Sequence, residues 1–281
     1  MTLANLRTLL KNDYAVPAFN AYNSETIQAI IQAGEETQSP LIIQASESAL
    51  EYAGLEEFAA YALKAISKTK IPVGLHLDHG KNLETVKKCF KNGFSSIMLD
   101  GSSKPFEENV KISLQAKKAA PGLPIELEIG ALAGKEDYVE EKEAKYTSPE
   151  DALRFYKLTK PDALAVSIGN SHGWSEKKLK LNFQLLKEIN EEIPAPLVLH
   201  GSSGVSDEQI KKAVKLGIRK INMDTQLRKS FTLALKKSLN ENPDINPRTH
   251  LTKAREAMKK TCIDRIKVCG SNGKAKTQGK K

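Results

Sequence analysis

Short apolar runs alternate with amphipathic stretches along almost the whole chain. The apolar runs are rich in Val, Ile and Leu and do not alternate cleanly with polar residues, which is typical of parallel strands buried on both faces. They lie at residues 16–19, 40–44, 72–77, 96–99, 125–129, 163–168, 196–199 and 220–223. The spacing of apolar residues between them predicts helices, for example over residues 24–37, 83–92 and 207–216.

This succession amounts to about eight strand–helix units, which is the number that a single-domain (β/α)8 TIM barrel requires. A doubly wound open sheet is the alternative, but it usually has fewer strands, and no GxGxxG motif follows the first predicted strand. We predict one barrel domain over residues 1–269. Residues 270–281 are rich in Gly, Lys and Ser without an apolar pattern, which predicts a basic, flexible C-terminal tail.

Composition narrows the class of protein. The chain has 281 residues, of which 40% are hydrophobic and 27% charged, so it can bury a large core without disulfide bonds. Its three cysteines form no CxxC pair, which favours a reducing compartment. The N-terminus lacks the apolar segment of a signal peptide, and no apolar run approaches the roughly 20 residues that cross a bilayer. We therefore expect a cytoplasmic protein without a membrane partner.

The net charge of +9 has two interpretations. Nucleic-acid binding is one, and a lysine-rich, solvated surface is the other. The basic residues are scattered over helical faces without interleaved aromatic residues, so we expect no nucleic-acid partner. A positive field would also attract a small anionic substrate.

Polar and ionisable residues gather at or near the carboxyl ends of the predicted strands. In a barrel these ends meet at one face, where active sites are built. The residues that the pattern brings into one ring are Asn20, Ser46, His76, Asp78, His79, Asp100, Glu126, Glu128, Asn170, His172, His200, Asn222, Asp224 and Thr225.

Histidines are concentrated in this ring. A single histidine at a strand end is more often structural, but His79, His172 and His200 come from three different strands and suit a zinc site with an open fourth position. Asp78, next to His79, is either a proton carrier beside the metal or a partner that orients a histidine. His250 lies in a polar C-terminal stretch and is expected to be incidental.

A glycine-serine turn follows the seventh predicted strand, at residues 201–204. Such turns are usually only turns. Here, however, the turn precedes a helix and lies between strands seven and eight, where barrels often bind phosphate with backbone N–H groups.

At these residues the chain resembles the class II, zinc-dependent aldolases of fructose bisphosphate and tagatose bisphosphate. The resemblance extends from about residue 6 to residue 275 and is carried by several motifs in the same order. The motifs are VPAFN at residues 16–20, HLDHG at 76–80, ELEIG at 126–130, GKED at 134–137, IGNSHG at 168–173, LHGSSG at 199–204, KINMDT at 220–225 and AREA at 254–257.

The resemblance implies a role for each matching residue. His79, His172 and His200 would bind zinc, Asp78 and Glu136 would be the catalytic proton carriers, and His76 would support the site. Asp100 and Glu128 match residues near a second or outer metal position. The residues that would bind substrate or its phosphate are Asn20, Ser46, Gly173, Gly201, Ser203, Asn222, Asp224, Thr225 and Arg255. Arg255 matches an arginine lent by a neighbouring subunit, and the phosphate loops of the family often hold a monovalent cation, Na⁺ or K⁺.

Two residues depart from the family pattern. Glu176 stands where the family usually has a lysine that holds phosphate, and Ser202 replaces a glycine of the phosphate loop. Both changes bear on substrate binding rather than on the metal. A class I aldolase would instead need a buried strand lysine. Lys220 is the residue to consider, but its predicted position flanking the eighth strand makes it a poor candidate.

The resemblance predicts reversible cleavage of fructose 1,6-bisphosphate to dihydroxyacetone phosphate and glyceraldehyde 3-phosphate, by a homodimer or homotetramer. Tagatose 1,6-bisphosphate or another ketose phosphate, such as one from inositol breakdown, is the alternative substrate. A zinc hydrolase on the same barrel is less favoured because the HxH pair common on its first strand is absent. A non-catalytic binding subunit is a third possibility, against which the intact Asp78 and the three histidines argue.

Overall fold

A closed ring of eight parallel strands forms the centre of the computed structural model, which describes residues 3–130, 133–136, 139–141, 146–172 and 179–275. Neighbouring strands pair all around the ring, and the pairing of β4 with β5 closes it. The (β/α)8 fold predicted from the sequence is thereby confirmed. The ring strands are β2 (Val16–Asn20), β3 (Leu41–Ala45), β4 (Val73–Gly80), β5 (Ser96–Leu99), β6 (Ile125–Ile129), β9 (Ala163–Val166), β11 (Leu197–Leu199) and β12 (Ile218–Met223).

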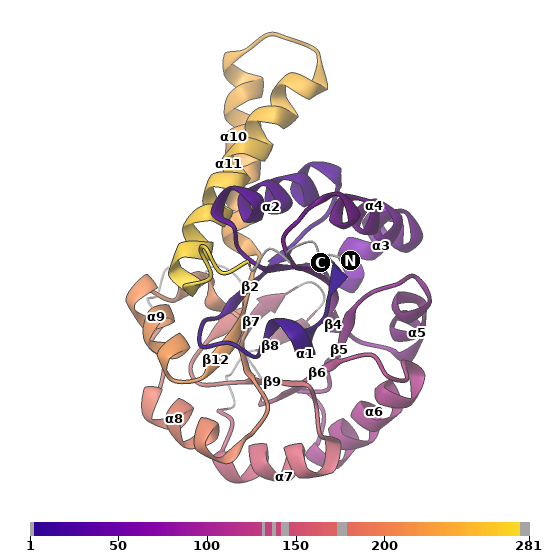
Figure 1. The fold of residues 1–281 in the computed structure, drawn as a ribbon, viewed down its shortest axis with the longest axis vertical. Coiled ribbons are helices and arrows are strands. Elements are labelled where there is room, and N and C mark those ends of the chain that lie inside the picture. Colours follow the sequence, from indigo (N-terminus) through magenta and orange to yellow (C-terminus); the bar gives the residue numbers. More distant parts are fainter. Residues whose placement is uncertain (1–2, 131–132, 137–138, 142–145, 173–178, 276–281) are drawn as a thin grey trace, which may run out of the picture.

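Helices surround the ring (Figure 1). Most of them begin where a polar side chain accepts a hydrogen bond from the first turn, as Asn23 does for α2 and Asn82 for α5, whereas α4 and α6 have no such cap. The helices bury their apolar stripe against the strands. The surrounding helices are α2 (Ser24–Thr37), α3 (Glu47–Ala53), α4 (Leu55–Lys68), α5 (Leu83–Lys91), α6 (Phe106–Ala119), α7 (Pro149–Thr159), α8 (Phe183–Glu192) and α9 (Asp207–Lys215).

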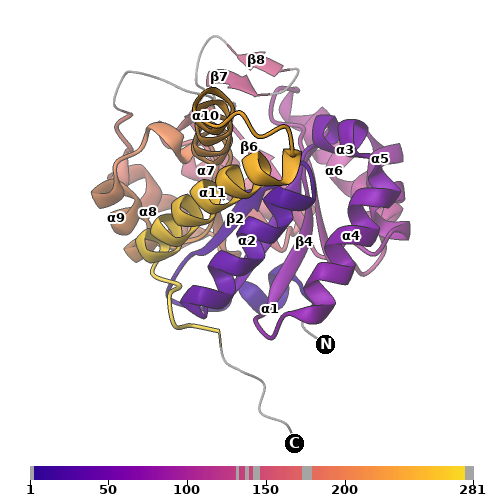
Figure 2. The same cartoon turned by 90° about the horizontal axis from the view of Figure 1, so that it is seen from above.

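The interior of the barrel has an apolar floor. Small and branched side chains from β2, β3, β9 and β11 fill its lower part, namely Val16, Ala18, Ile42, Ala163, Ala165 and Val198. The short helix α1 (Leu6–Leu9) packs its leucines against them, and β1 (Leu3–Ala4) pairs with β4. Figure 2 shows α1 at the end of the barrel opposite to β7 (Ala133–Glu136) and β8 (Val139–Glu141). One end of the barrel is thus closed to water, and the polar residues expected at the strand ends lie at the other end.

Two long helices, α10 (Thr225–Glu241) and α11 (Pro247–Cys269), form a hairpin that projects from the barrel (Figure 1). The base of α11 packs against α2. Within the hairpin the His250 ring is buried and faces the Ser238 hydroxyl and the Asp244 carbonyl, which fits the expectation that this histidine has no part in the site.

Several boundaries differ from the predicted ones. β4 continues through Gly80, and β12 begins at Ile218, two residues earlier than expected. A three-stranded sheet of β7, β8 and β10 (Ser171–His172) was not predicted. The first residues of the expected tail pack on the barrel, since Ser271 is buried against Ser39 and the Ala275 N–H donates to the Gln38 carbonyl. Residues 276–281 lie outside the described residues.

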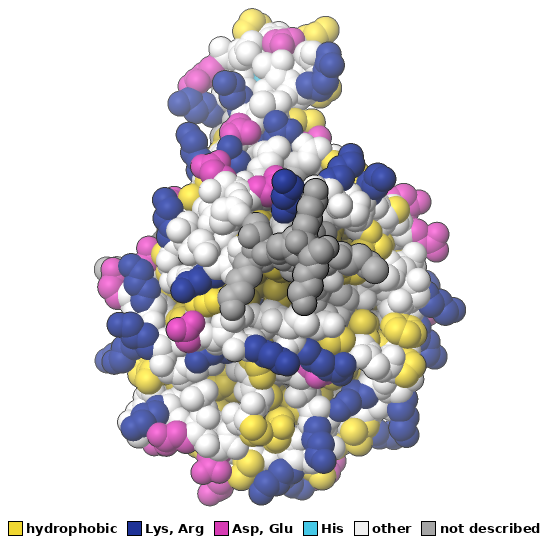
Figure 3. All heavy atoms as spheres, viewed as in Figure 1, with side chains coloured by type: hydrophobic (Ala, Val, Ile, Leu, Met, Phe, Trp, Pro, Cys, Tyr) yellow, Lys and Arg dark blue, Asp and Glu magenta, His cyan; other side chains and the backbone are white. Residues whose placement is uncertain are grey.

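The surface carries charge of both signs. On the face shown in Figure 3, Lys and Arg side chains are spread over the helices and interspersed with Asp and Glu. Among the helices that the structure describes, none combines the length and the apolar character needed to cross a membrane.

Candidate active site

The polar residues of the predicted ring gather at the carboxyl end of the barrel, and Asp78 and His79 lie at its centre. Consecutive residues of a strand normally face opposite sides. Here a β-bulge interrupts the pairing of β4 with β5 between Leu77 and Gly80, and His79 has a φ of 44°. The bulge re-aims the chain, so that both side chains reach the same cluster.

Three side-chain amides hold the Asp78 carboxylate. Asn20 and Gln44 donate to one oxygen, each at 2.9 Å, and Asn222 donates to the other, also at 2.9 Å. The carboxylate is buried, and it would lose its hydration without compensation if these donors were absent. These bonds fix both oxygens in space.

The rings of His79 and His200 face each other. His79 Nε2 lies 2.7 Å from His200 Nδ1, with the ring planes 85° apart. The outer nitrogen of each ring faces a carboxylate at hydrogen-bond distance, His79 Nδ1 at 2.8 Å from Asp100 and His200 Nε2 at 2.7 Å from Glu126. A carboxylate accepts a hydrogen bond, so it places the proton on that outer nitrogen.

The two inner nitrogens therefore both point lone pairs into the space between the rings. Lone pairs that face each other repel unless a cation accepts both. Burial lowers the pKa of His200, and the nearby His79 lowers it further, which favours the neutral ring that binds metals. Asp78, His79 and His200 bring ligand atoms within 4.8 Å of one another. The donor set of this cluster fits a divalent cation such as Zn²⁺.

A second candidate group adjoins the first. His79, Asp100 and Glu128 also bring ligand atoms within 4.8 Å of one another. Burial would raise the pKa of Asp100, but the hydrogen bond and charge of His79, aided by the Ser102 N–H, hold it below its usual value. Asp100 and Glu128 thus lie beside the His79 ring, and the second or outer metal position that the resemblance implies for them stays a prediction.

A buried ion pair lies beneath the cluster. Lys220 Nζ is 2.9 Å from one oxygen of Glu126, and both side chains are inaccessible to solvent. Burial would raise the pKa of Glu126, but attraction to Lys220 and the hydrogen bond from His200 lower it below its usual value. His76, the expected supporting residue, lies 3.6 Å from the same oxygen and faces Ser96 with its other nitrogen. Burial holds its pKa well below the usual value.

The predicted position of Lys220 was wrong. The residue lies inside β12 and not beside it, because the strand starts at Ile218 and the side chain points into the barrel. Its nitrogen faces Glu126 and Asn222 and not the space between the two histidine rings. The argument against a Schiff base therefore rests on these contacts and not on a flanking position.

Three predicted site residues, and Glu176, are described only in part or not at all. The backbones of His172 and Glu136 lie in β10 and β7, but their side chains are outside the described part of the structure, and so are Gly173 and Glu176. The backbone of β10 nevertheless lies beside the His200 segment: a Cβ on Gly201 would be 2.4 Å from the Ser171 carbonyl oxygen. This brings the chain at His172 close to the cluster.

One of the expected phosphate loops forms the 3-10 helix η1 (Ser202–Gly204). Gly201 caps the start of this helix and has a φ of 56°. Ser202 turns its hydroxyl inward and donates to the Asn222 carbonyl at 2.7 Å, so this departure from the family pattern ties the loop to β12. Ser203 accepts a hydrogen bond from Gln226 through its carbonyl oxygen. Ser46 caps α3, and Thr225 opens α10.

Asp224, directly before α10, contacts Tyr22 and lies 2.7 Å from Arg228. Burial raises the pKa of its carboxyl group to about 6, although Arg228 opposes the shift. A carboxyl group in this state can donate as well as accept a hydrogen bond near neutral pH.

Arg255 lies apart from the cluster. Its guanidinium donates to Gln28 on α2 at 2.7 Å and approaches Glu256, and its described contacts include none with the histidines or Asp78. Within this chain the structure does not bring it to the site.

Sequence reasoning assigned no role to Gln44 and misjudged Lys220. Both are polar residues at inward positions of otherwise apolar strands, and this is the signal by which they could have been found. Gln44 pairs in register with His76 on the next strand. A glutamine that faces the barrel interior must find a polar partner, and Asp78 is that partner.

Comparisons with known proteins show the family of the chain. The family model "Fructose-bisphosphate aldolase class-II" matches residues 2–274. A sulfofructosephosphate aldolase of Alkalicoccus urumqiensis is 41% identical over 97% of this chain and 96% of its own. The crystal structure of the YdjI aldolase of Escherichia coli K12 superimposes with a TM-score of 0.85 at 34% identity, over 98% of this chain and 100% of that one. A candidate fructose-1,6-bisphosphate aldolase of Coccidioides immitis gives a TM-score of 0.87 at 29% identity, over 96% of each chain.

Proposed function

Since this chain belongs to the class II fructose-bisphosphate aldolase family, we propose that it catalyses the reversible, zinc-dependent retro-aldol cleavage of a phosphorylated ketose. The single observation that carries the proposal is the facing pair of histidine nitrogens with the Asp78 carboxylate beside it. The contacts with Asp100 and Glu126 favour tautomers in which an unprotonated nitrogen of each ring is directed towards the other ring, the arrangement that two ligands of one cation adopt.

His79 and His200 would hold the ion, and His172 is the expected third ligand. When bound, a divalent cation stabilises, as a Lewis acid, the negative charge that develops on the substrate oxygens as the carbon–carbon bond breaks. Asp100 keeps the His79 ring in place, and Glu126 does the same for His200.

Asp78 is the proposed base for cleavage. The hydroxyl group at the scissile bond must lose its proton as that carbon becomes an aldehyde, and Asp78 takes it. The amides of Asn20, Gln44 and Asn222 hold the carboxylate so that one orientation serves both directions of the reaction. On the ketone side the carbon that keeps the bonding electrons gains a proton, for which Glu136 is the proposed donor.

The loops after β9, β11 and β12 are the proposed phosphate site. Gly201 and Ser203 offer backbone N–H groups to an anion at the start of η1. Gly173, which lies outside the described residues, is expected from the resemblance to add a third. Asn222, Asp224 and Thr225 line the adjoining strand end and helix start, and a Na⁺ or K⁺ ion would balance charge there. Ser46 is proposed to line the pocket on the opposite side.

Two substrates deserve direct comparison. Fructose 1,6-bisphosphate is the first, as the resemblance predicts. The 41% identity with a sulfofructosephosphate aldolase supports the second, a ketose phosphate with a sulfonate in place of the distal phosphate. Tagatose 1,6-bisphosphate should be assayed beside these two substrates. The ratio of kcat/KM values, from a coupled assay for dihydroxyacetone phosphate, identifies the substrate.

The mechanism is tested by removing the metal. We expect cleavage to stop in the presence of a chelator and to return when zinc is added. His200→Ala should bind no zinc by metal analysis, whereas His250→Ala, which alters a histidine of the hairpin, should bind it normally. Cleavage that persists after complete metal removal contradicts the proposal. Hydrolysis of the substrate without release of a triose phosphate would favour the hydrolase alternative.

A further inference from the structure

Lys220 is a buried cation that the proposed mechanism does not use. It projects from the middle of β12 into the barrel, between the apolar floor and the polar cluster, and no part of its side chain reaches solvent. An ammonium group in such a place costs desolvation free energy and needs partners of complementary charge. Lys220 has two, which act on different parts of the site.

The first partner is Asn222, whose side-chain oxygen accepts a hydrogen bond from Lys220 Nζ at 2.6 Å. An ammonium group only donates, so it selects the oxygen of the amide and excludes the flipped orientation. The NH2 group of Asn222 must then point the other way. There it donates to Asp78 at 2.9 Å and lies 3.2 Å from His200 Nδ1.

The second partner is Glu126, whose two oxygens face different groups. One oxygen is 2.9 Å from Lys220, and the other is 2.7 Å from His200 Nε2. The attraction to Lys220 holds the carboxylate under the His200 ring. In that position the carboxylate fixes the ring proton on Nε2, and Nδ1 remains directed at His79.

We propose that Lys220 is a positioning residue for the reaction. Its ammonium group fixes the side chains of Asn222 and Glu126. Asn222 in turn orients the carboxylate of Asp78, and Glu126 orients the metal-facing nitrogen of His200. One buried charge thereby sets the relative geometry of the proton carrier and the metal ligand. This inference rests on the proposed function for its catalytic half, and its metal half can be measured without any substrate.

The test is Lys220→Met, which keeps the length and apolar stem of the side chain and removes the charge. In the zinc-loaded full chain we expect kcat to fall roughly tenfold to a hundredfold, as for other groups that orient metal ligands, while KM changes less than about twofold. Zinc affinity, measured by competition with a chelating dye, should weaken by roughly tenfold or more.

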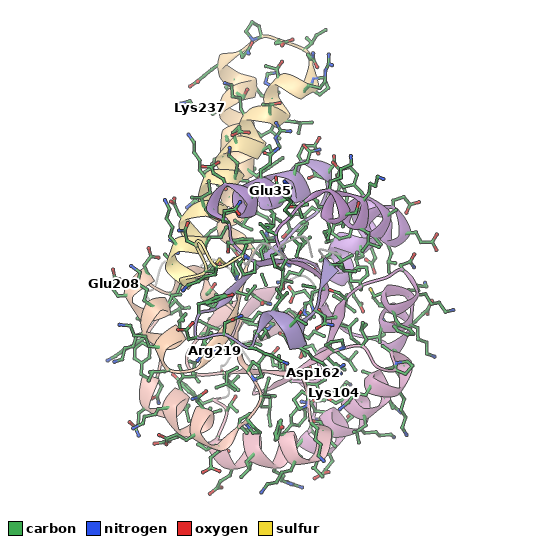
Figure 4. All side chains as sticks on the ribbon, in the orientation of Figure 1. Glu35, Lys104, Asp162, Glu208, Arg219 and Lys237 are labelled. Atoms are coloured by element: carbon green, nitrogen blue, oxygen red, sulfur yellow. The ribbon has the colours of Figure 1, made fainter. Side chains whose placement is uncertain are left out.

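Arg219→Met is the matched control. Arg219 is the neighbouring residue on β12, but it donates to the carbonyls of Val214 and Ile218 near α1 (Figure 4) and faces away from the cluster. We expect wild-type kcat and zinc affinity from this variant.

A double variant decides the case in which Lys220→Met fails to fold because the buried Glu126 carboxylate has lost the positive charge of Lys220. Lys220→Met with Glu126→Gln removes both buried charges, so it should fold. It still lacks the group that orients Asn222, and kcat should stay low. Wild-type kcat and zinc affinity in a folded Lys220→Met, or wild-type kcat in the double variant, overturns the inference. If the wild-type protein cleaves no ketose phosphate, the proposed function fails instead, and the zinc affinities still test the role of Lys220.

Discussion

Asp224, a single residue near the site, affects the stability of the whole chain. Its carboxyl group is buried at the start of α10, between Tyr22 and Arg228. Burial raises its pKa to about 6, above the value of about 3.9 expected in the unfolded chain. The folded protein therefore holds this proton more tightly than the unfolded protein does. The free energy of unfolding therefore falls as the pH rises from about 4 to about 6, and the full penalty is present above that range.

We predict that Asp224→Asn raises the free energy of unfolding at pH 8 by up to about 3 kcal/mol, because a shift of one pKa unit corresponds to about 1.4 kcal/mol. At pH 4 the variant and the wild type should differ little. Urea unfolding of the zinc-free protein at both pH values measures this. Asp244→Asn is the control, since the pKa of that exposed carboxyl group is lowered by Thr249 and should give no stabilisation at pH 8. A gain of equal size at both pH values would point to a cause other than ionisation.

The sequence predicted the bounds of some elements that hold the site, and it missed those of others. Strands such as β5 and β6 were placed at their observed bounds, β5 because its apolar run ends at Asp100 and β6 because Pro124 and Gly130 flank it. The continuation of β4 through Asp78 and His79 was missed, since polar residues at a strand end look like the start of a loop. The set of residues expected around the site was inferred only from their positions at the carboxyl ends of predicted strands. The contacts between its members depend on side-chain direction, which the bulge in β4 alters.

Short strands outside the barrel were beyond the reach of pattern reasoning. β10 has two residues, and β7 has four, of which two are glycine and alanine. Neither has the alternation or apolar run that marks a strand. Their pairing depends on tertiary contacts, in particular on the close approach of β10 to Gly201.

We predict that Gly201→Ala disrupts this contact. The left-handed φ of 56° disfavours alanine, and the new Cβ would meet the Ser171 carbonyl oxygen at 2.4 Å, so β10 must move. We expect the free energy of unfolding to fall by roughly 1–3 kcal/mol and zinc affinity to fall as well. Chemical unfolding of the metal-free chain and a zinc titration measure the two effects.

Gly122→Ala separates the two causes. Gly122 has a φ of 80°, but nothing lies within 4 Å of its would-be Cβ, so this variant carries the backbone penalty without the clash. If Gly201→Ala costs no more stability than Gly122→Ala and binds zinc normally, β10 does not depend on the close approach.

On the scale of the whole molecule, the hairpin of α10 and α11 is an unusual feature for a barrel. It extends beyond the ring of helices and exposes Leu233 and Leu239 by more than half of their side-chain surface (Figure 1). Apolar side chains on a projecting arm are typical of contacts between subunits. The homodimer or homotetramer expected from the resemblance is therefore proposed to assemble through this arm, and Arg255 on α11 is proposed to serve a neighbouring subunit.

We predict that the wild-type chain sediments as a dimer or tetramer and that Leu233→Glu with Leu239→Glu shifts it towards the monomer, because buried charge opposes association. Leu158→Glu is the control, since Leu158 on α7 is similarly exposed, at 48%, but lies on the wall of the barrel. Analytical ultracentrifugation over a range of concentrations measures the shift. An unchanged oligomer in the double variant, or a monomeric wild type, contradicts this assignment of the arm.

The bulge at residues 78 and 79 has a consequence for how such a protein can diversify. A single peptide unit separates the proposed proton carrier, Asp78, from the proposed metal ligand, His79, so covalent geometry sets their Cα atoms about 3.8 Å apart, whatever substrate is bound. The spacing of these two groups is thus inherited with one strand, while the loops proposed to bind the ends of the substrate can vary without changing it. A chain with this fold can therefore acquire a new substrate specificity through changes in its loops while the residues at 78 and 79 keep their spacing.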